Sequence, residues 1–319
     1  MEFFRITKDI PFMRYALPCN ILSSTAFILA VVCLVIRGLN FSIEFTGGTI
    51  IEVGYPQPPE LQSLRDHLNE KGFLGSQVQN FGAAREVLIR VPPLDNQKSS
   101  EVGPRMLDIL NSMPQSASNP PTLKRVEYVG PQIGEELAND GALALLVVII
   151  GILIYLGLRF EWRFSIAALV ANMHDVIIIL GFFAWFQWEF SLPVLAAVLA
   201  VLGYSVNESV VVFDRVREIF KRTRGMDTPR VLNHAITCTM SRTVITHGST
   251  MMMVGSMLLL GGEVLYYFAL ALTIGILFGI YSSIMVASPL VMWLGVSREQ
   301  FVPRKTDKPD GMTKDGAAV

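Results

Sequence analysis

The chain has 319 residues, of which 51% are hydrophobic and 17% are charged, and its formal net charge is −1. This composition excludes an ordinary soluble protein and is typical of a membrane protein, while the net charge gives no indication of a nucleic-acid partner. The cysteines, Cys19, Cys33 and Cys238, are too widely spaced for a disulfide framework or a cysteine-based metal site.

Long apolar runs predict six membrane helices. The first run, residues 17–37, has the length needed to cross a bilayer and lacks the small-residue cleavage site of a signal peptide. We therefore expect a retained first transmembrane helix after a short N-terminal segment, residues 1–16. Residues 139–296 are expected to contain the other five helices, and the apolar runs place these at 141–158, 164–186, 192–213, 244–260 and 264–294.

The polar region between the first two runs, residues 38–138, predicts a separate α+β domain. Its expected order is strand, helix, strand, strand, helix, strand, which is the order of a ferredoxin-like split βαβ unit. The fold class is therefore an α-helical bundle of six transmembrane helices carrying one ferredoxin-like domain. The predicted strands lie at 41–55, 77–81, 86–91 and 122–129, and the helices contain Leu61, Leu64 and Leu68 and then Val102, Met106 and Leu110.

The distribution of Lys and Arg predicts the orientation in the membrane. These residues gather in the N-terminal segment, between the second and third helices, in the loop 215–242 and in the tail 297–319, which a six-helix topology puts on one side. We expect that side to be cytoplasmic, with both termini inside and the ferredoxin-like domain in the periplasm. The tail is rich in Pro, Lys, Asp and Gly, and we expect it to be disordered.

The stretch 203–215 places polar groups inside the fourth apolar run. Glu208 and Asn207 must lie in or near hydrocarbon, where a carboxyl group costs a few kcal/mol and is rarely retained without a function. Tyr204 lies on the helical face of Glu208, whereas Asn207 and Asp214 share another face. This pattern predicts an ion or proton path; the alternative is a hydrogen-bonded cluster that packs helices together.

Two further features of the apolar runs predict contacts inside the bundle. His174 and Asp175, in the middle of the third helix, are interpreted either as a relay group near Glu208 or as a structural pair. Asp214 and Arg215 are expected to form an ion pair at the end of the fourth helix. No third metal ligand and no nucleophile–base pair is visible, so we expect neither a metal site nor an enzyme. Small residues at every fourth position of the last helix predict a close-packing face for another helix, either inside this chain or in a partner: Ala271, Gly275, Gly279, Ser283 and Ala287.

Five motifs in a fixed order resemble those of the SecD/SecF family of protein-export membrane proteins, which belongs to the resistance-nodulation-division superfamily. The resemblance runs from the first helix to the sixth. The motifs are Phe45-Thr-Gly-Gly-Thr49, Val129-Gly-Pro-Gln-Ile-Gly134, Phe160-Glu-Trp-Arg163, His174-Asp-Val176 and Gly203-Tyr-Ser-Val-Asn-Glu-Ser209, the last followed by Phe213-Asp-Arg215.

The resemblance implies an assembly in the bacterial inner membrane. The superfamily repeats a six-helix unit with one external insertion, and this chain has the unit once, so it implies a SecD partner of the same architecture. It also implies association with the SecYEG channel, other Sec accessory subunits, membrane lipids and a translocating preprotein. Protons are the implied coupling ion, driven by the proton-motive force, and no cofactor is expected.

The resemblance also assigns roles to residues. In the family, the acid of the Tyr-Ser-x-Asn-acid motif and an Arg at the start of the fifth helix carry the proton-coupled function; these are Glu208 and Arg242 here. Many family members have Asp at the position of Glu208. Asn207 and Tyr204 are then expected to position the acid. Because Arg cannot release its proton, we expect Arg242 to lie near Glu208 as a fixed counter-charge. The competing functions are a half-transporter for small molecules or lipids and a scaffold that does not transport.

Overall fold

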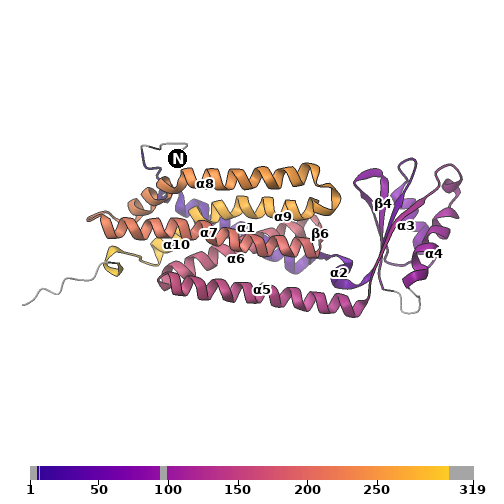
Figure 1. Cartoon of the computed structure of the whole chain (residues 1–319), viewed down its shortest axis with the longest axis horizontal. Coiled ribbons are helices and arrows are strands. Elements are labelled where there is room, and N and C mark those ends of the chain that lie inside the picture. Colours follow the sequence, from indigo (N-terminus) through magenta and orange to yellow (C-terminus); the bar gives the residue numbers. More distant parts are fainter. Residues whose placement is uncertain (1–5, 7, 94–98, 302–319) are drawn as a thin grey trace, which may run out of the picture.

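The computed structural model describes residue 6 and residues 8–93 and 99–301, so most of the tail that we expect to be disordered lies outside it. Within the described residues, six helices are long and apolar enough to cross a membrane. They form an elongated bundle, and a small α+β domain projects from one end of it (Figure 1). The predicted fold class is confirmed: a multi-pass helical bundle with one ferredoxin-like domain.

The first five membrane helices are longer than the apolar runs that predict them, whereas the last run, 264–294, covers two successive helices joined by a π-helical turn. The largest difference is α8 (Thr228–Leu260), because residues 228–242, which belong to the predicted loop 215–242, are continuous with the fifth transmembrane helix. Pro229 occupies the first turn of α8, and no further proline interrupts it. The helices are α1 (Ala16–Arg37), α5 (Pro131–Arg159), α6 (Trp162–Phe186), α7 (Leu192–Arg222), α8 (Thr228–Leu260) and α9 (Gly262–Ser282), after which a π-helical turn (Ser283–Ala287) leads into α10 (Ser288–Trp293).

Helices α6, α7 and α9 form the interior of the bundle, and α1, α5 and α8 lie at its periphery. The small residues of α9 make this packing possible. A Cβ atom at Gly275 would lie 2.3 Å from Val201 Cγ2, and one at Gly279 would lie 3.4 Å from the Ser205 side chain. The predicted close-packing face is therefore used within this chain, where it brings α9 against α7.

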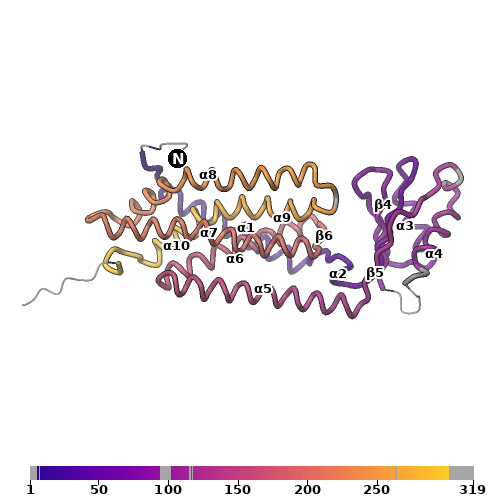
Figure 2. Tube along the Cα trace, viewed as in Figure 1, coloured from indigo at the N-terminus to yellow at the C-terminus, as the bar shows by residue number. Residues whose placement is uncertain are grey.

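The α+β domain contains one antiparallel sheet with the strand order β3-β4-β2-β5, as a ferredoxin-like unit requires. Two helices cover one face of the sheet, and their apolar residues form a core with Ile51, Val53 and Ile89. The opposite face is turned towards the bundle (Figure 2). The elements are β2 (Gly48–Gly54), α3 (Leu61–Glu70), β3 (Gln77–Phe81), β4 (Ala83–Val91), α4 (Ser99–Asn111) and β5 (Thr122–Val129).

The strand expected over residues 41–55 is wrong in its first half. The short strand β1 (Asn40–Phe41) pairs with β6 (Glu189–Phe190), in the connection between α6 and α7. A single helical turn, α2 (Ile43–Thr46), follows, and Gly47 and Gly48 then redirect the chain with φ angles of 71° and 128°. The chain enters β2 at the second of these glycines. Their φ values suit glycine and not the β-branched residues that follow.

Two glycine motifs meet where the domain joins the bundle. A Cβ atom at Gly134, in the first turn of α5, would lie 2.7 Å from the backbone nitrogen of Gly47. A Cβ atom at Gly47 would in turn lie 2.8 Å from the Cα atom of Pro131. The α2 turn and the start of α5 are therefore in backbone contact, and this junction tolerates no side chain at either glycine.

A buried ion pair is the second connection between domain and bundle. Arg90, on the helix-free face of the sheet, is only 6% exposed and forms an ion pair with Glu189 of β6. Burial raises the pKa of Glu189 above its ordinary value of 4.5, the Arg90 charge lowers it, and the nearby Glu44 charge raises it again. The net shift is upward, so burial outweighs the attraction of Arg90.

Adding a methyl group at Gly134 tests the backbone contact at the junction. We expect Gly134→Ala to destabilise the protein by about 1–3 kcal/mol, because the new Cβ overlaps backbone atoms that cannot rotate away. Thermal unfolding in detergent measures the change. Gly151→Ala, on the same helix with open space at its Cβ position, is the control and should be neutral or slightly stabilising. Equal effects of the two substitutions would contradict the contact.

The substitution Arg90→Gln tests how burial and the Arg90 charge together set the pKa of Glu189. In Arg90→Gln, burial and Glu44 both still raise the pKa of Glu189, so we expect that pKa to rise further. A carboxyl whose folded pKa exceeds its unfolded value stabilises the fold fully below the unfolded pKa, and this contribution is lost as pH rises through the folded pKa. The variant should therefore lose this contribution over a range that extends to higher pH.

Infrared titration of the Glu189 carboxyl and unfolding temperatures between about pH 4 and pH 8 measure this shift. Arg125→Gln is the matched control, because Arg125 pairs with Glu127 on the exposed edge strand β5. An unchanged Glu189 pKa in Arg90→Gln would refute the assignment of the pair.

Candidate functional site

Glu208 lies inside the bundle on α7, where its side chain is 6% exposed. Both of its carboxyl oxygens are hydrogen-bonded by α8. Thr243 Oγ1 donates to Oε1 at 2.5 Å, and His247 Nε2 lies 3.2 Å from Oε2. Thr243 and His247 are one helical turn apart, so they present adjacent groups to the same carboxyl. The predicted intramembrane acid is therefore buried and fully engaged.

Tyr204 lies one turn from Glu208 along α7 and reaches the site through His247. The two rings are T-shaped with centroids 5.0 Å apart. The Tyr204 hydroxyl donates to Thr250 Oγ1 at 3.1 Å, which fixes the ring against α8. Tyr204 thus supports the neighbour of the acid and makes no hydrogen bond to the acid itself.

Asn207, the second predicted support, lies elsewhere. Its side chain is on an exposed face of α7 and has no hydrogen bond to the part of the chain that the structure describes. Successive residues on a helix point about 100° apart, so burying Glu208 against α8 turns its neighbour outward. Gly203, one turn away, is also exposed and has open space around it.

Arg242 does not meet Glu208, contrary to our expectation. Its side chain is exposed on α8, and within residues 8–93 and 99–301 it has no ion pair. The reason is again helical rotation: Thr243 faces the interior, so Arg242 points to the outer surface at nearly the same depth in the bundle. Thr243 and His247 occupy the positions beside the two Glu208 carboxyl oxygens where we expect the Arg242 guanidinium.

His174 and Asp175, on α6, form a second buried polar cluster that packs against an adjoining face of α7. Asp175 Oδ2 accepts hydrogen bonds from Ser205 on α7 and Ser282 on α9, both at 2.7 Å. His174 Nδ1 lies 3.1 Å from Asp175 Oδ1, and its Nε2 lies 2.7 Å from Ser23 Oγ on α1. The pair thus connects four helices.

No hydrogen bond joins this second cluster to Glu208 among the described residues. The separation matches the structural interpretation of the pair, since its bonds to Ser23, Ser205 and Ser282 are all helix–helix contacts. A relay role stays a prediction. The nearest link is α7 itself, which carries Ser205 in one cluster and Glu208 in the other.

The expected pairing of Asp214 with Arg215 is wrong. Asp214 forms its ion pair with Arg159, at the end of α5, with a distance of 2.5 Å. Arg215 pairs with Glu218 on the next turn of α7 at 2.6 Å. Consecutive residues on a helix point about 100° apart. Asp214 and Arg215 therefore face different neighbours and form ion pairs with different residues. Asp214 consequently ties α5 to α7 and lies away from Glu208.

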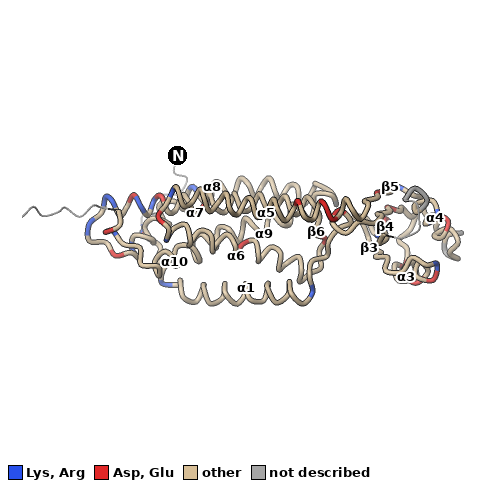
Figure 3. Tube along the Cα trace, turned by 90° about the horizontal axis from the view of Figure 1, so that it is seen from below, with Lys and Arg blue, Asp and Glu red and all other residues tan. Residues whose placement is uncertain are grey.

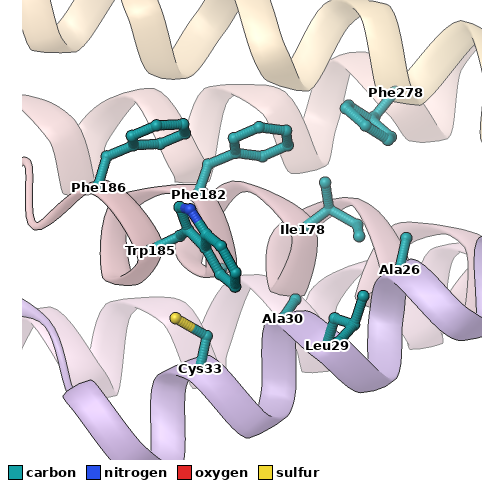
Figure 4. A pocket seen from close by; sticks show the side chains of 10 residues that line it. Ala26, Leu29, Ala30, Cys33, Ile178, Phe182, Trp185, Phe186 and Phe278 are labelled. Atoms are coloured by element: carbon teal, nitrogen blue, oxygen red, sulfur yellow. The ribbon is translucent and has the colours of Figure 1, made fainter.

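Neither a metal cluster nor the apolar groove between helices supplies a competing site. In the described ranges, no three His, Cys, Asp or Glu side chains are placed to hold a metal ion. A groove of about 280 Å³ lies between α1, α6 and α9, and Figure 4 shows that aliphatic and aromatic side chains such as Leu29, Phe182 and Phe278 line it. It contains none of the predicted site residues.

Thr243 and His247 are the site residues that our sequence reasoning missed. A signal was present: a hydroxyl and an imidazole stand four residues apart in an apolar helix, which places both on one face. The sequence alone does not determine the rotation of α8 about its own axis. That rotation decides whether this face or the neighbouring Arg242 meets α7.

A multi-pass membrane bundle with a buried carboxyl and a projecting ferredoxin-like domain defines a class of membrane protein that carries an ionisable group among its transmembrane helices and a folded domain outside them. The family described as protein export membrane protein SecD/SecF, C-terminal, matches residues 110–297, and the SecD/SecF GG motif matches residues 34–58. Protein translocase subunit SecF of Vibrio alginolyticus is 40% identical, with 96% of each chain covered. That of Pseudomonas aeruginosa is 43% identical, covering 89% of this chain and 92% of the relative. The chain belongs to the SecD/SecF family.

Solved structures of the family agree with this fold. The crystal structure of SecDF, a translocon-associated membrane protein from Thermus thermophilus, has a TM-score of 0.81 and is 37% identical, covering 92% of this chain. SecDF in a super-membrane-facing form has a TM-score of 0.65 at 36% identity. This chain spans 39% of each of those longer chains.

Removing one donor to Asp175 tests the cross-helix cluster. We expect Ser282→Ala to lower the free energy of unfolding by about 1–3 kcal/mol, since a buried carboxyl oxygen loses one of its hydrogen-bond donors. Denaturant unfolding in detergent, followed by tryptophan fluorescence, measures the loss. Ser256→Ala is the control, because Ser256 is exposed and donates within its own helix; it should change stability by less than about 0.5 kcal/mol.

Proposed function

We propose that this chain is the SecF-type half of an accessory complex of the Sec protein translocase, which uses the proton-motive force to promote export of unfolded preproteins. The names of its relatives support the translocase role, and the SecDF chain supports a SecD-type partner that supplies the remaining part. The observation that carries the proton-coupled role is the buried, hydrogen-bonded Glu208. SecYEG, other accessory subunits and the preprotein are the proposed further partners.

The exposure of Arg242 and Asn207 supports the proposal that a helix of a partner subunit packs against α7 and α8. Both side chains are exposed at the depth of Glu208, and a charged group facing hydrocarbon is costly. A second subunit covering this surface would remove Arg242 from lipid. It could also offer Arg242 a carboxylate or bring it towards Glu208, which restores the counter-charge role within the complex.

The two connections between bundle and domain offer a route from proton binding to movement. Glu189 lies between α6, which carries Asp175, and α7, which carries Glu208. Arg90 then links Glu189 to the sheet. In the proposed cycle, a change in the packing of α7 on protonation of Glu208 shifts the β1–β6 pair and tilts the domain, which holds and then releases the exported chain.

We place the protein in the bacterial inner membrane, with both termini cytoplasmic and the domain in the periplasm. Lys and Arg gather at the end of the bundle that lies away from the domain (Figure 3). Positively charged loops favour the cytoplasmic side. In this orientation the proton-motive force is directed from the domain side to the opposite side, and we propose that Glu208 takes up protons, the coupling ion, along that direction without a cofactor.

The competing functions predict different features. A half-transporter for small molecules or lipids requires a larger external region with a pore or docking surface, whereas one four-stranded sheet with two helices forms this domain. A scaffold without transport requires no ionisable group inside the bundle. The small domain therefore argues against the half-transporter, and the buried Glu208 argues against the scaffold.

Neutralising Glu208 tests the proposal. We expect Glu208→Gln, in membrane vesicles that contain the Sec channel and the SecD partner, to abolish the part of preprotein export that depends on the proton gradient. Glutamine keeps the size of the side chain and cannot carry the proton. Glu218→Gln, at the exposed end of the same helix, is the matched control and should export normally. Gradient-dependent export by Glu208→Gln at the wild-type rate would favour the scaffold.

A further inference from the structure

His247 has a buried imidazole ring without a role in the proposed protonation cycle of Glu208. Its side chain is 5% exposed, and Nε2 lies 3.2 Å from Glu208 Oε2. The second ring nitrogen, Nδ1, is also buried and has no hydrogen-bond partner in the described part of the chain. Most buried polar atoms are hydrogen-bonded, and an exception is frequently a group with a chemical role.

The groups of the site are arranged in order along the axis of the bundle. Helix α8 runs from the end that lies away from the domain towards the domain (Figure 1). His247 therefore lies about 6 Å nearer the domain than Thr243, at 1.5 Å per residue. Glu208 is hydrogen-bonded by both, so Thr243 contacts it from one side and His247 from the domain side. Tyr204 and Thr250 continue the polar groups in the same direction.

We propose that His247 is a proton-transfer group that delivers protons to Glu208 from the domain side. This inference rests on the proposed function, because it specifies how Glu208 is loaded. It also gives a reason for glutamate at position 208: the longer side chain carries its carboxyl to within hydrogen-bonding distance of the His247 ring.

The transfer is balanced by one proton entering and one leaving. With Glu208 ionised, Nε2 carries the hydrogen that bonds to Oε2, and Nδ1 has a free lone pair. A proton binds Nδ1 while the Nε2 proton moves to Oε2, which leaves a neutral ring and a protonated carboxyl. Glu208 then releases its proton towards the opposite end. The ring returns to its first tautomer when a water molecule accepts the Nδ1 proton and a proton is passed through water to Nε2, so the ring neither gains nor loses a proton and one proton has moved from the domain side through Glu208.

The other polar and charged groups around Glu208 and His247 are not placed to transfer this proton. On α7, Tyr204 contacts the ring by its face or edge and directs its hydroxyl to Thr250. On α8, Arg242 points outward. Between Val264 and Ser282, α9 contains no Asp, Glu, His, Lys or Arg. Asp175 is engaged by Ser205 and Ser282 in the separate cluster. His247 is thus the one imidazole bonded to Glu208 among the described residues.

The test measures proton flux in liposomes that contain the complex of the full chain with its SecD partner, using an entrapped pH-sensitive dye. We expect His247→Gln to lower the flux about a hundredfold, at the low end of the effect of a positioned proton-transfer group. External imidazole should restore flux to His247→Ala in a concentration-dependent way. His234→Gln, on the same helix with its ring paired to Asp9, is the control and should match wild type.

The outcomes separate this inference from the function on which it rests. Wild-type flux in Glu208→Gln would overturn the proton-coupled function. Loss of flux in Glu208→Gln together with normal flux in His247→Gln would overturn only the role of His247. A reduced flux at every pH with no rescue by imidazole would make His247 a positioning residue and also refute proton transfer.

If His247→Gln fails to assemble with its partner, nitrogen NMR of labelled histidine in the wild-type complex gives the answer. We expect the tautomer of His247 to change over the pH range in which flux changes, and Glu208→Gln to abolish that change. A ring that stays in one tautomer throughout this range would overturn the proposal.

Discussion

A carboxyl group inside an apolar helix bundle must find its hydrogen-bond partners on neighbouring helices, because hydrocarbon offers none. This constraint organises the bundle around α7. Glu208 draws Thr243 and His247 of α8 to one face of that helix, while Ser205 on the adjoining face reaches Asp175 and so connects α6 and α9. The close approach of α9 depends on its glycines, since any side chain at Gly275 would collide with Val201.

The features predicted correctly are those that depend on composition and local periodicity. Six apolar runs predicted six membrane helices, and β-branched segments together with apolar residues at helical spacing predicted the ferredoxin-like order of strands and helices. Glu208 could be identified as an unusual residue because a carboxyl in a membrane helix is informative by itself. These features require no knowledge of how one helix is rotated against another.

The errors in the candidate site all concern the direction in which a side chain points. Arg242 was paired with Glu208, Asn207 was expected to support the acid, and Asp214 was paired with Arg215. Each requires the rotation of α7 or α8 about its axis, which tertiary packing sets and a single sequence does not record. The failed strand over residues 41–47 has a similar cause, because the pairing of β1 with β6 is a contact between segments far apart in the chain. Where a partner subunit covers the surface, as we propose for Arg242, even the folded chain alone leaves the final contact open.

Helix α5 has the properties of a lever. Along its length only Gly134, Gly141 and Leu156 are buried, and it is held at one end by the glycine junction and at the other by the Arg159–Asp214 pair. Its 29 residues span about 44 Å at helical rise. A tilt of about 10° over that length displaces the far end by roughly 8 Å, so a small rearrangement beside α7 at one end of the bundle becomes a large excursion of the domain at the other.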